Sequence, residues 1–409
     1  MEVFLARQPI LDRRRRLYGY ELLYRPAQAA DQFDGTEAFS ATQQVISSAL
    51  LAIGLEQIAG GKKTFLNFDH RLLSEGAHLT LPASTAVIEI LETVEPTESL
   101  LALCRRVRDQ GYSIALDDFV DGAQFEPLTR LAQLIKVDMR LTSREEQKRL
   151  LRTYRPLGIE MLAEKVETYE EFEWARRAGY DYFQGYFFAR PAVISGKQVP
   201  AAKMNCLRLM SEVQAPELDF KRLEAVIQAD VALAYRLLRY VNSALFARRS
   251  EIRSIERALT IMGSNEIRRW VALAALPVLA ADKPGELSTL AVVRARFCER
   301  LIGAAGIGRQ NDAFLMGMFS LLDALLDCPL DQALGSVALA PGITNALLGT
   351  APESDALRQI YQLTCVYEHG DWDEVERLAR GCGLTGLDAG NAYVESAVWA
   401  HEMMASVME

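Results

Sequence analysis

Polar side chains that could bind a metal recur at the ends of hydrophobic stretches throughout the first half of the sequence. The stretch YGYELLYRP, residues 18–26, carries a single acid, Glu21, among aromatic and aliphatic residues. A buried carboxylate is costly unless it is paired or bound to a metal, so Glu21 is either a solvent-facing acid at a strand end or the first residue of a site. The residues that continue the pattern are Asn67, Glu89, Asp117, Asp118, Lys136, Asp138, Glu164, Glu167 and Gln184.

The donor atoms of this set define the chemistry. Nearly all are carboxylate or amide oxygens, and hard oxygen ligands suit Mg²⁺ or Mn²⁺ better than Zn²⁺. The adjacent Asp117 and Asp118 can form a two-metal core in which the first carboxylate bridges both ions, as in enzymes that cleave phosphodiesters. Lys136 would then orient or activate the attacking water, and Arg25 would hold a phosphate oxygen. The pattern therefore predicts metal-dependent attack on a phosphodiester.

Short hydrophobic runs that alternate with amphipathic stretches must position these residues. The predicted strands are residues 64–68, 86–91, 113–119, 134–138, 160–166 and 182–188, with two more near 3–6 and 17–23. Helices are predicted at 98–111 and 167–179, which end at Gly111 and Gly179 where C-caps are expected. About eight strands favour a (β/α)8 barrel, with a doubly wound sheet as the weaker alternative. In a barrel all eight strand ends would open on one face and gather the polar side chains.

In the second half of the chain, patterns typical of strands nearly disappear and patterns typical of helices replace them. The stretch Pro191–Pro200 contains Pro, Gly and Ser and predicts a linker. After it, segments 220–246, 287–306 and 312–326 carry apolar residues at three-and-four spacing, which is typical of helices. The sequence therefore predicts two domains, an α/β barrel at 1–195 and an all-α domain at 201–409, in line with a length of 409 residues.

Composition and charge exclude several classes of protein. A formal net charge of -9 argues against a protein that coats a nucleic-acid polymer, and the basic run Arg13–Arg16 is interpreted as a solvated turn between two strands rather than a phosphate patch. The six cysteines are scattered, which suggests reduced thiols rather than a disulfide framework or a zinc site. No apolar run approaches a membrane span and no signal region begins the chain, so a cytoplasmic protein is expected.

Seven motifs in the first half resemble a known family. In chain order YELLYR, LNF, EILE, DDF, KVD, AEKVE and QGYFF resemble the signatures of EAL-type cyclic-di-GMP phosphodiesterases, with Leu22 in place of the alanine of EAL. The resemblance covers about residues 1–195. It implies a modified TIM barrel that hydrolyses cyclic-di-GMP to linear pGpG by in-line attack of a water on phosphorus.

The resemblance also implies a role for each motif residue. Two divalent ions, Mg²⁺ or Mn²⁺, would be held, the first by Glu21, Asn67, Glu89 and Asp117 and the second by Asp117, Asp118 and Glu164. The implied catalytic residues are Lys136, Glu164, Glu167 and Glu92, of which Lys136 would contact the nucleophilic water and Glu92 would hold the loop after the paired aspartates. The implied substrate-binding residues are Arg25, Leu22 and Gln184.

Three features depart from the family pattern. The loop after the aspartates reads DDFVDGAQF, with Val120 and Asp121 before Gly122; Lys165 replaces the glycine of AEGVE; and Asp69 stands where a serine is common. Two functions remain open: an active phosphodiesterase with an altered regulatory loop, or a degenerate domain that binds the dinucleotide or only a protein partner. A metal-free structural barrel is disfavoured because buried carboxylates repel one another.

The second half resembles the HDOD domain, a relative of the HD phosphohydrolases. The matching landmarks are Leu238, Asn242–Ser243–Ala244, Ser254–Ile255, Ala258–Leu259 and Met262–Gly263. HD enzymes bind their metals through several histidines and a His-Asp doublet, whereas residues 201–368 contain no histidine and the chain contains no such doublet. The resemblance therefore implies a noncatalytic output domain that binds an unidentified protein partner, and it allows a homodimer.

Overall fold

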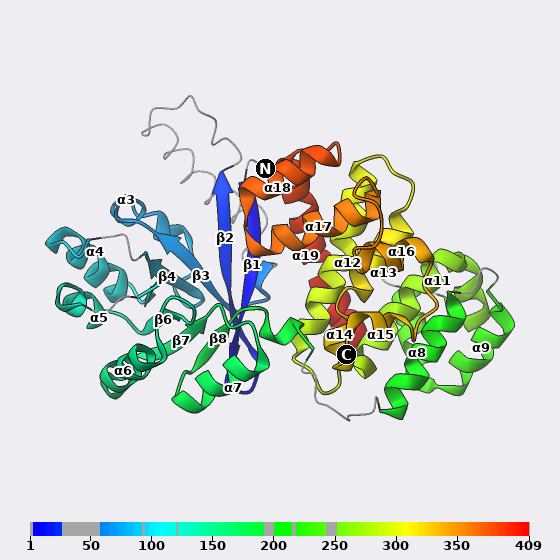
Figure 1. The fold of residues 1–409 in the computed structure, drawn as a ribbon, viewed down its shortest axis with the longest axis horizontal. Helices are drawn as coiled ribbons and strands as arrows, with labels where there is room; N and C mark the ends of the chain where they lie inside the picture. Colours follow the sequence, from blue (N-terminus) through cyan, green and yellow to red (C-terminus); the bar gives the residue numbers. More distant parts are fainter. Residues whose placement is uncertain are drawn as a thin grey trace. The chain divides into compact units, whose positions relative to one another are not determined.

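The chain forms two compact units in the computed structural model, which describes residues 3–26, 58–91, 95–119, 122–191, 200–214, 218–242 and 252–408. One unit comprises Met1–Arg190 with Glu368–Trp372, and the other Pro191–Tyr367 with Asp373–Glu409. Strands and helices alternate in the first unit, and the described part of the second is helical (Figure 1). The predicted fold class, an α/β barrel followed by an all-α domain, is confirmed.

A closed eight-stranded barrel forms the centre of the first unit. Its strands are β1 (Val3–Asp12), β2 (Leu17–Pro26), β3 (Lys63–Phe68), β4 (Ala86–Ile90), β5 (Ser113–Leu116), β6 (Leu134–Asp138), β7 (Glu160–Glu164) and β8 (Tyr182–Gln184). Strands β2 to β8 are parallel, whereas β1 is antiparallel to both β2 and β8. Closure excludes the doubly wound sheet, and the expectation that all eight strand ends open on one face is wrong for β1.

The inside of the barrel is filled by a layer of apolar side chains, here called the barrel floor. It consists of Ile10, Phe65, Val87, Ala115, Leu134 and Leu162. Strands β1 and β3 to β7 each contribute one of these residues, and every residue of β4 and β6 is buried. Burial on both faces explains why these strands read as continuous hydrophobic runs rather than as alternating patterns.

Side-chain caps fix the ends of the helices around the barrel. These helices are α3 (His70–Ser74), α4 (Glu98–Asp109), α5 (Glu126–Thr129), α6 (Arg144–Tyr154) and α7 (Tyr169–Ala178). Thr97 and Ser143 cap α4 and α6, and Thr168 forms a reciprocal capping box with Glu171 at the start of α7. Gly179 ends α7 with a φ of 119°, as its position in the sequence predicted.

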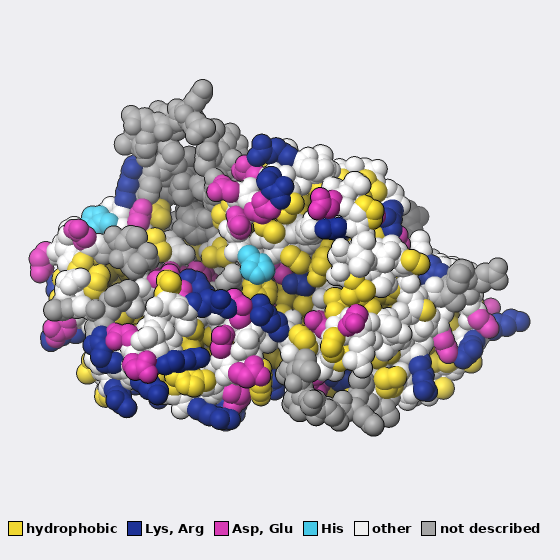
Figure 2. All heavy atoms as spheres, in the orientation of Figure 1, with side chains coloured by type: hydrophobic (Ala, Val, Ile, Leu, Met, Phe, Trp, Pro, Cys, Tyr) yellow, Lys and Arg dark blue, Asp and Glu magenta, His cyan; other side chains and the backbone are white. Residues whose placement is uncertain are grey.

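Charged side chains of both signs are interspersed on the surface of the first unit that Figure 2 shows. The basic run Arg13–Arg16 lies in the turn between β1 and β2, where Arg16 pairs with Asp12 and Arg13 donates to the carbonyl oxygen of Tyr180. These contacts confirm the interpretation of the run as a turn.

The second unit is built from helices α8 to α19. Their bounds are α8 (Ala201–Val213), α9 (Phe220–Ala229), α10 (Val231–Val241), α11 (Ile255–Leu279), α12 (Gly285–Ala304), α13 (Gln310–Phe319), α14 (Leu322–Leu326), α15 (Leu330–Leu334), α16 (Pro341–Leu347), α17 (Ala356–His369), α18 (Trp372–Gly381) and α19 (Gly386–Met408). Asp230 separates the helices of segment 220–246, and Ser254 caps α11. Within the described ranges, none of the helices has both the length and the apolar character that a membrane crossing requires. Residues 192–199 of the predicted linker lie outside the described residues.

Candidate active site

A layer of polar side chains lies directly above the barrel floor. Asn67, Glu89, Asp117, Lys136 and Glu164 each stand two residues after a floor residue on the same strand, or, for Asp117, just beyond the end of β5. Alternate residues of a strand face the same side of the sheet. The polar side chains therefore point into the barrel like the floor residues, and they lie one layer closer to the carboxyl ends of the strands. The period of two thus explains why five of the seven separated motifs contribute to one site.

The ammonium group of Lys136 lies at the centre of this layer. Its Nζ is 2.7 Å from Oε1 of Glu164, 2.8 Å from Oε1 of Glu89, 2.8 Å from Oδ1 of Asp117 and 3.2 Å from Oε2 of Glu21. The lysine side chain is completely buried. The structure therefore brings four of the six predicted metal ligands together around one cation.

The pKa values of these groups follow from burial and crowding. Burial raises the pKa of Glu164 to about 8, with the charges of Asp117 and Glu21 acting in the same direction against Lys136. Burial and the charge of Glu21 likewise raise the pKa of Glu89 well above its usual range. Burial acts to lower the pKa of Lys136, but the four surrounding acids raise it well above the ordinary lysine value. The lysine is therefore charged, and its single charge leaves the acids incompletely compensated.

The donor set fits a hard divalent cation, although the acids are closed on the ammonium in this conformation. Oε2 of Glu89 and Oδ1 of Asp118 are buried oxygens without a hydrogen-bond partner in the described part of the chain. Among the residues described, no three acidic, histidine or cysteine side chains stand arranged to hold a metal. An ion would therefore have to displace the ammonium of Lys136 from the acids before they could coordinate it.

Glu21 is oriented by amide side chains. Nε2 of Gln184 donates to Oε2 of Glu21 at 2.6 Å and to Oε1 of Gln8 at 2.9 Å, and Nδ2 of Asn67 approaches Oε1 of Glu21 at 3.4 Å. Glu21 is only 5% exposed and lies within β2. It is therefore not a solvent-facing acid at a strand end, and its membership of a functional site stays a prediction.

A close approach of two chain segments explains the glycine that follows Gln184. Gly185 has a φ of 140°, and a Cβ atom added there would lie 2.1 Å from the carbonyl oxygen of Val166. Only glycine avoids both the strained backbone and this clash. The QGY motif thus contains two residues with separate roles. Gln184 orients Glu21, and Gly185 allows the chain after β8 to pass close to Val166.

Lys165 places a second ammonium in a pocket at this end of the barrel, which Glu21, Asp117, Asp118 and Glu164 also line. The lysine has a φ of 54°, in the left-handed region, and its Nζ donates to Oδ2 of Asp138 and lies 3.8 Å from Oδ2 of Asp118. Burial acts to lower the pKa of Lys165, but Asp138 and Asp118 raise it above the ordinary value. Lys165 stands where the family pattern has a glycine, and its backbone keeps the left-handed conformation that favours glycine.

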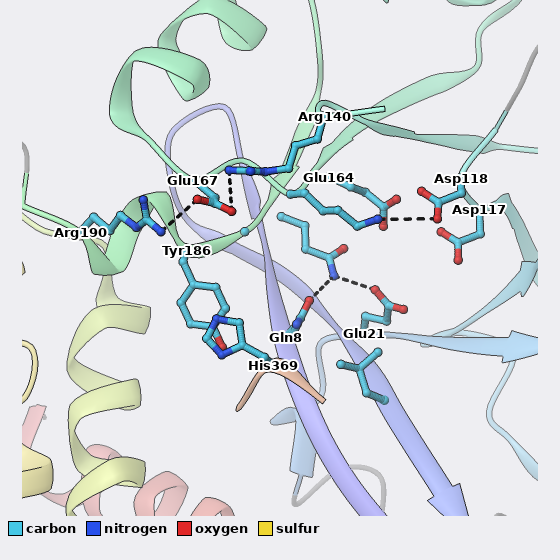
Figure 3. A pocket seen from close by; sticks show the side chains of 14 residues that line it. Gln8, Glu21, Asp117, Asp118, Arg140, Glu164, Glu167, Tyr186, Arg190 and His369 are labelled. Atoms are coloured by element: carbon cyan, nitrogen blue, oxygen red, sulfur yellow. Dashed lines mark hydrogen bonds and ion pairs between the residues drawn. The ribbon is translucent and has the colours of Figure 1, made fainter. Parts of the chain in front are cut away.

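Glu167 lies in the same pocket between two arginines rather than against Lys136. Its Oε1 is 2.6 Å from Arg140 and its Oε2 is 3.0 Å from Arg190 (Figure 3). The motifs of the sequence single out neither arginine. The available signal was their position beside motifs, since Arg140 comes two residues after KVD and Arg190 two residues after QGYFF.

The remaining predicted residues are placed only in part. Leu22 is fully buried, and Asp69 caps α3 by accepting a hydrogen bond from the backbone N–H of Leu72. The side chain of Arg25, together with Glu92, Val120 and Asp121, lies outside the described residues. Roles in substrate binding and catalysis for Leu22, Arg25 and Glu92 stay predictions.

Comparison with known proteins places this site in a family. The EAL domain model matches residues 1–191 and the HDOD domain model residues 199–327. Over 403 residues the chain is 34% identical to the cyclic di-GMP phosphodiesterase CdgJ of Vibrio cholerae, covering 98% of this chain and 93% of that protein. The chain belongs to the EAL–HDOD proteins. The chain is also 32% identical over 412 residues to the uncharacterized protein YuxH of Bacillus subtilis, covering 99% of each protein.

Solved structures resemble the EAL barrel. A calcium and cyclic-di-GMP complex of BlrP1 from Klebsiella pneumoniae is 25% identical with a TM-score of 0.38, over 47% of this chain and 56% of that chain. An EAL domain protein from Listeria monocytogenes is 24% identical with a TM-score of 0.36, over 46% of this chain and 87% of that chain.

Loss of the hydrogen bond between Gln184 and Glu21 is expected to weaken metal binding by the EAL barrel. Residues that orient a metal ligand typically account for about 10–100-fold in metal affinity, so Gln184→Leu should raise the dissociation constant for Mn²⁺ by that factor. Isothermal titration calorimetry of metal-free protein measures it. Gln8→Leu is the matched control, with a smaller effect expected because Oε1 of Gln8 accepts a hydrogen bond from Gln184, whereas Gln184 itself donates to the carboxylate of Glu21. Unchanged affinity in Gln184→Leu would contradict this role.

Proposed function

We propose that the EAL barrel hydrolyses cyclic-di-GMP to linear pGpG in a reaction that requires Mg²⁺ or Mn²⁺, and that the HDOD half is a noncatalytic interaction domain. The observation that carries the proposal is the convergence of Glu21, Glu89, Asp117 and Glu164 within 3.2 Å of one point. The 34% identity to a cyclic di-GMP phosphodiesterase over nearly the whole chain supports the choice of substrate.

The acids at the centre of the layer would hold the metal. Glu21, Asn67, Glu89 and Asp117 form the first predicted set, while Asp117, Asp118 and Glu164 form the second. When bound, divalent ions lower the pKa of water and stabilise negative charge on the phosphoryl oxygens. Lys136 would leave the acids and donate a hydrogen bond to the attacking water, which keeps that water in line with the departing ribose 3′-oxygen.

Cationic side chains at the pocket would bind the substrate phosphates. Arg140 and Arg190 line the pocket, and each is paired with Glu167. A guanidinium group matches the geometry of phosphate oxygens, so either arginine could exchange Glu167 for a phosphate. Attack of the water would form a bond between its oxygen and phosphorus and break the bond between phosphorus and the 3′-oxygen, and the proton lost by the water would pass to the 3′-oxygen.

The HDOD half is proposed to act by binding. Residues 201–368 contain no histidine, so the ligand set of an HD phosphohydrolase is missing from that segment. A protein partner for this half and a homodimer both stay predictions, as does a cytoplasmic location.

Incubation of the purified protein with cyclic-di-GMP and Mg²⁺ or Mn²⁺ tests the proposal. Chromatography should show pGpG with the wild-type protein and none with Glu21→Ala. If the wild-type protein binds cyclic-di-GMP but forms no product with either ion, the proposed hydrolase activity is excluded and the barrel is a receptor for the dinucleotide. If it neither cleaves nor binds the dinucleotide, only a scaffold remains.

A further inference from the structure

Lys165 adopts a backbone conformation that its residue type disfavours. It directly follows Glu164 at the end of β7, and its φ of 54° lies in the left-handed region. Glycine adopts this region freely, whereas a lysine there is held against its preference. Such residues persist only where the surroundings fix them, and they cluster at functional sites.

The contact that fixes Lys165 is its ion pair with Asp138. Asp138 is nearly fully buried, and its Oδ1 accepts hydrogen bonds from the backbone N–H groups of Arg140 at 2.6 Å and Leu141 at 3.1 Å. Its other oxygen, Oδ2, accepts from Nζ of Lys165. A carboxylate that is itself held by two backbone groups thus holds the ammonium in place.

The same ammonium faces the second predicted metal set. Nζ of Lys165 is 3.8 Å from Oδ2 of Asp118, and both residues line the pocket beside Asp117 and Glu164. Asp118 and Glu164 are the two acids predicted for the second ion alone. A cation bound at Asp118 would share this ligand with the ammonium of Lys165, whose side chain is half-exposed, and like charges at such a separation repel.

We propose that the ammonium of Lys165 takes the place of the second divalent ion, so that the barrel binds one metal ion per chain at the acids around Lys136. The proposal rests on the proposed function, because it assumes that those acids hold a metal. The acids differ in their existing compensation. Glu21, Glu89, Asp117 and Glu164 share the single charge of Lys136, whereas Asp118 lies 3.8 Å from the ammonium of Lys165, which also pairs with Asp138.

Counting bound Mn²⁺ tests this assignment without depending on activity. Metal-free full-length protein is titrated with Mn²⁺, and the free ion is followed by electron paramagnetic resonance. We expect one bound ion for the wild-type protein and for Lys165→Arg, which keeps the charge. Lys165→Gly and Lys165→Asn remove the charge and suit a left-handed backbone, so they should bind two ions, the second at least tenfold more tightly than any second binding to the wild-type protein. Lys62→Asn, in the exposed turn before β3, is the control and should bind one.

The outcomes separate this proposal from the proposed function. Two bound ions in the wild-type protein would overturn the role of Lys165. A single bound ion in both Lys165→Gly and Lys165→Asn would also overturn it, and this is the result expected if the ion pair with Asp138 is only structural. One ion in a wild-type sample that forms no pGpG would overturn the proposed function alone. Absence of any Mn²⁺ binding would overturn both.

Discussion

Asp117→Asn is expected to lower the rate of cyclic-di-GMP hydrolysis by about a thousandfold or more. Asp117 belongs to both predicted metal sets and its Oδ1 contacts the central ammonium at 2.8 Å. The amide of asparagine keeps the shape of the side chain but removes its charge. Stabilisation of a phosphoryl transition state by a metal ion contributes several kcal/mol. Each ~1.4 kcal/mol lost from it lowers the rate by a factor of ten. The rate of pGpG formation at saturating Mn²⁺ and substrate measures the effect.

Asp109→Asn is the matched control for that experiment. Asp109 is exposed at the end of α4, so the same chemical change there should leave the rate unchanged. If Asp117→Asn kept more than about a tenth of the wild-type rate, less than ~1.4 kcal/mol of barrier would depend on this acid, and a central role for it would be excluded.

Lys136→Met is expected to destabilise the metal-free protein by about 3–5 kcal/mol, the typical cost of removing one partner from a buried ionic cluster. The substitution preserves bulk but leaves four carboxylates without their shared cation. Urea unfolding in the presence of EDTA measures the change. Addition of Mn²⁺ at a hundredfold excess over its dissociation constant should restore about 2.7 kcal/mol.

The response to Mn²⁺ distinguishes an ionic from a packing role for Lys136. Because the ammonium competes with a metal for the same acids, Mn²⁺ should stabilise Lys136→Met more than it stabilises the wild-type protein. Lys62→Met, at an exposed turn, should change stability little. Equal stabilisation of the variant and the wild-type protein by Mn²⁺ would show that the lysine does not occupy the metal position.

The strands and their polar residues could be predicted because the relevant signals are local. The hydrophobic runs at β4 and β6 need only a few consecutive residues to be recognised, and Glu89 and Lys136 stand out within them as isolated charges. Period-two alternation then places each charge above a floor residue. The same local reasoning predicted the C-cap at Gly179.

Other features depend on contacts between residues far apart in the chain and carry no local signal. The closure of the barrel depends on the pairing of Ile10 on β1 with Gln184 on β8, which are more than 170 residues apart in the chain. The pairs of Lys165 with Asp138 and of Glu167 with Arg140 join loops from different strands. The sequence showed that Lys165 replaces a glycine, but only the structure shows that its ammonium reaches Asp118.

The pairing of Ile10 with Gln184 that closes the barrel also determines when the site can assemble. The antiparallel contact of β1 with β2 is local and can form early, whereas the second edge of β1 has no partner until residues 182–184 have left the ribosome. Gln184 supplies both that closing pair and the amide that orients Glu21. The nascent chain therefore closes its barrel and orients Glu21 in the same late step of folding.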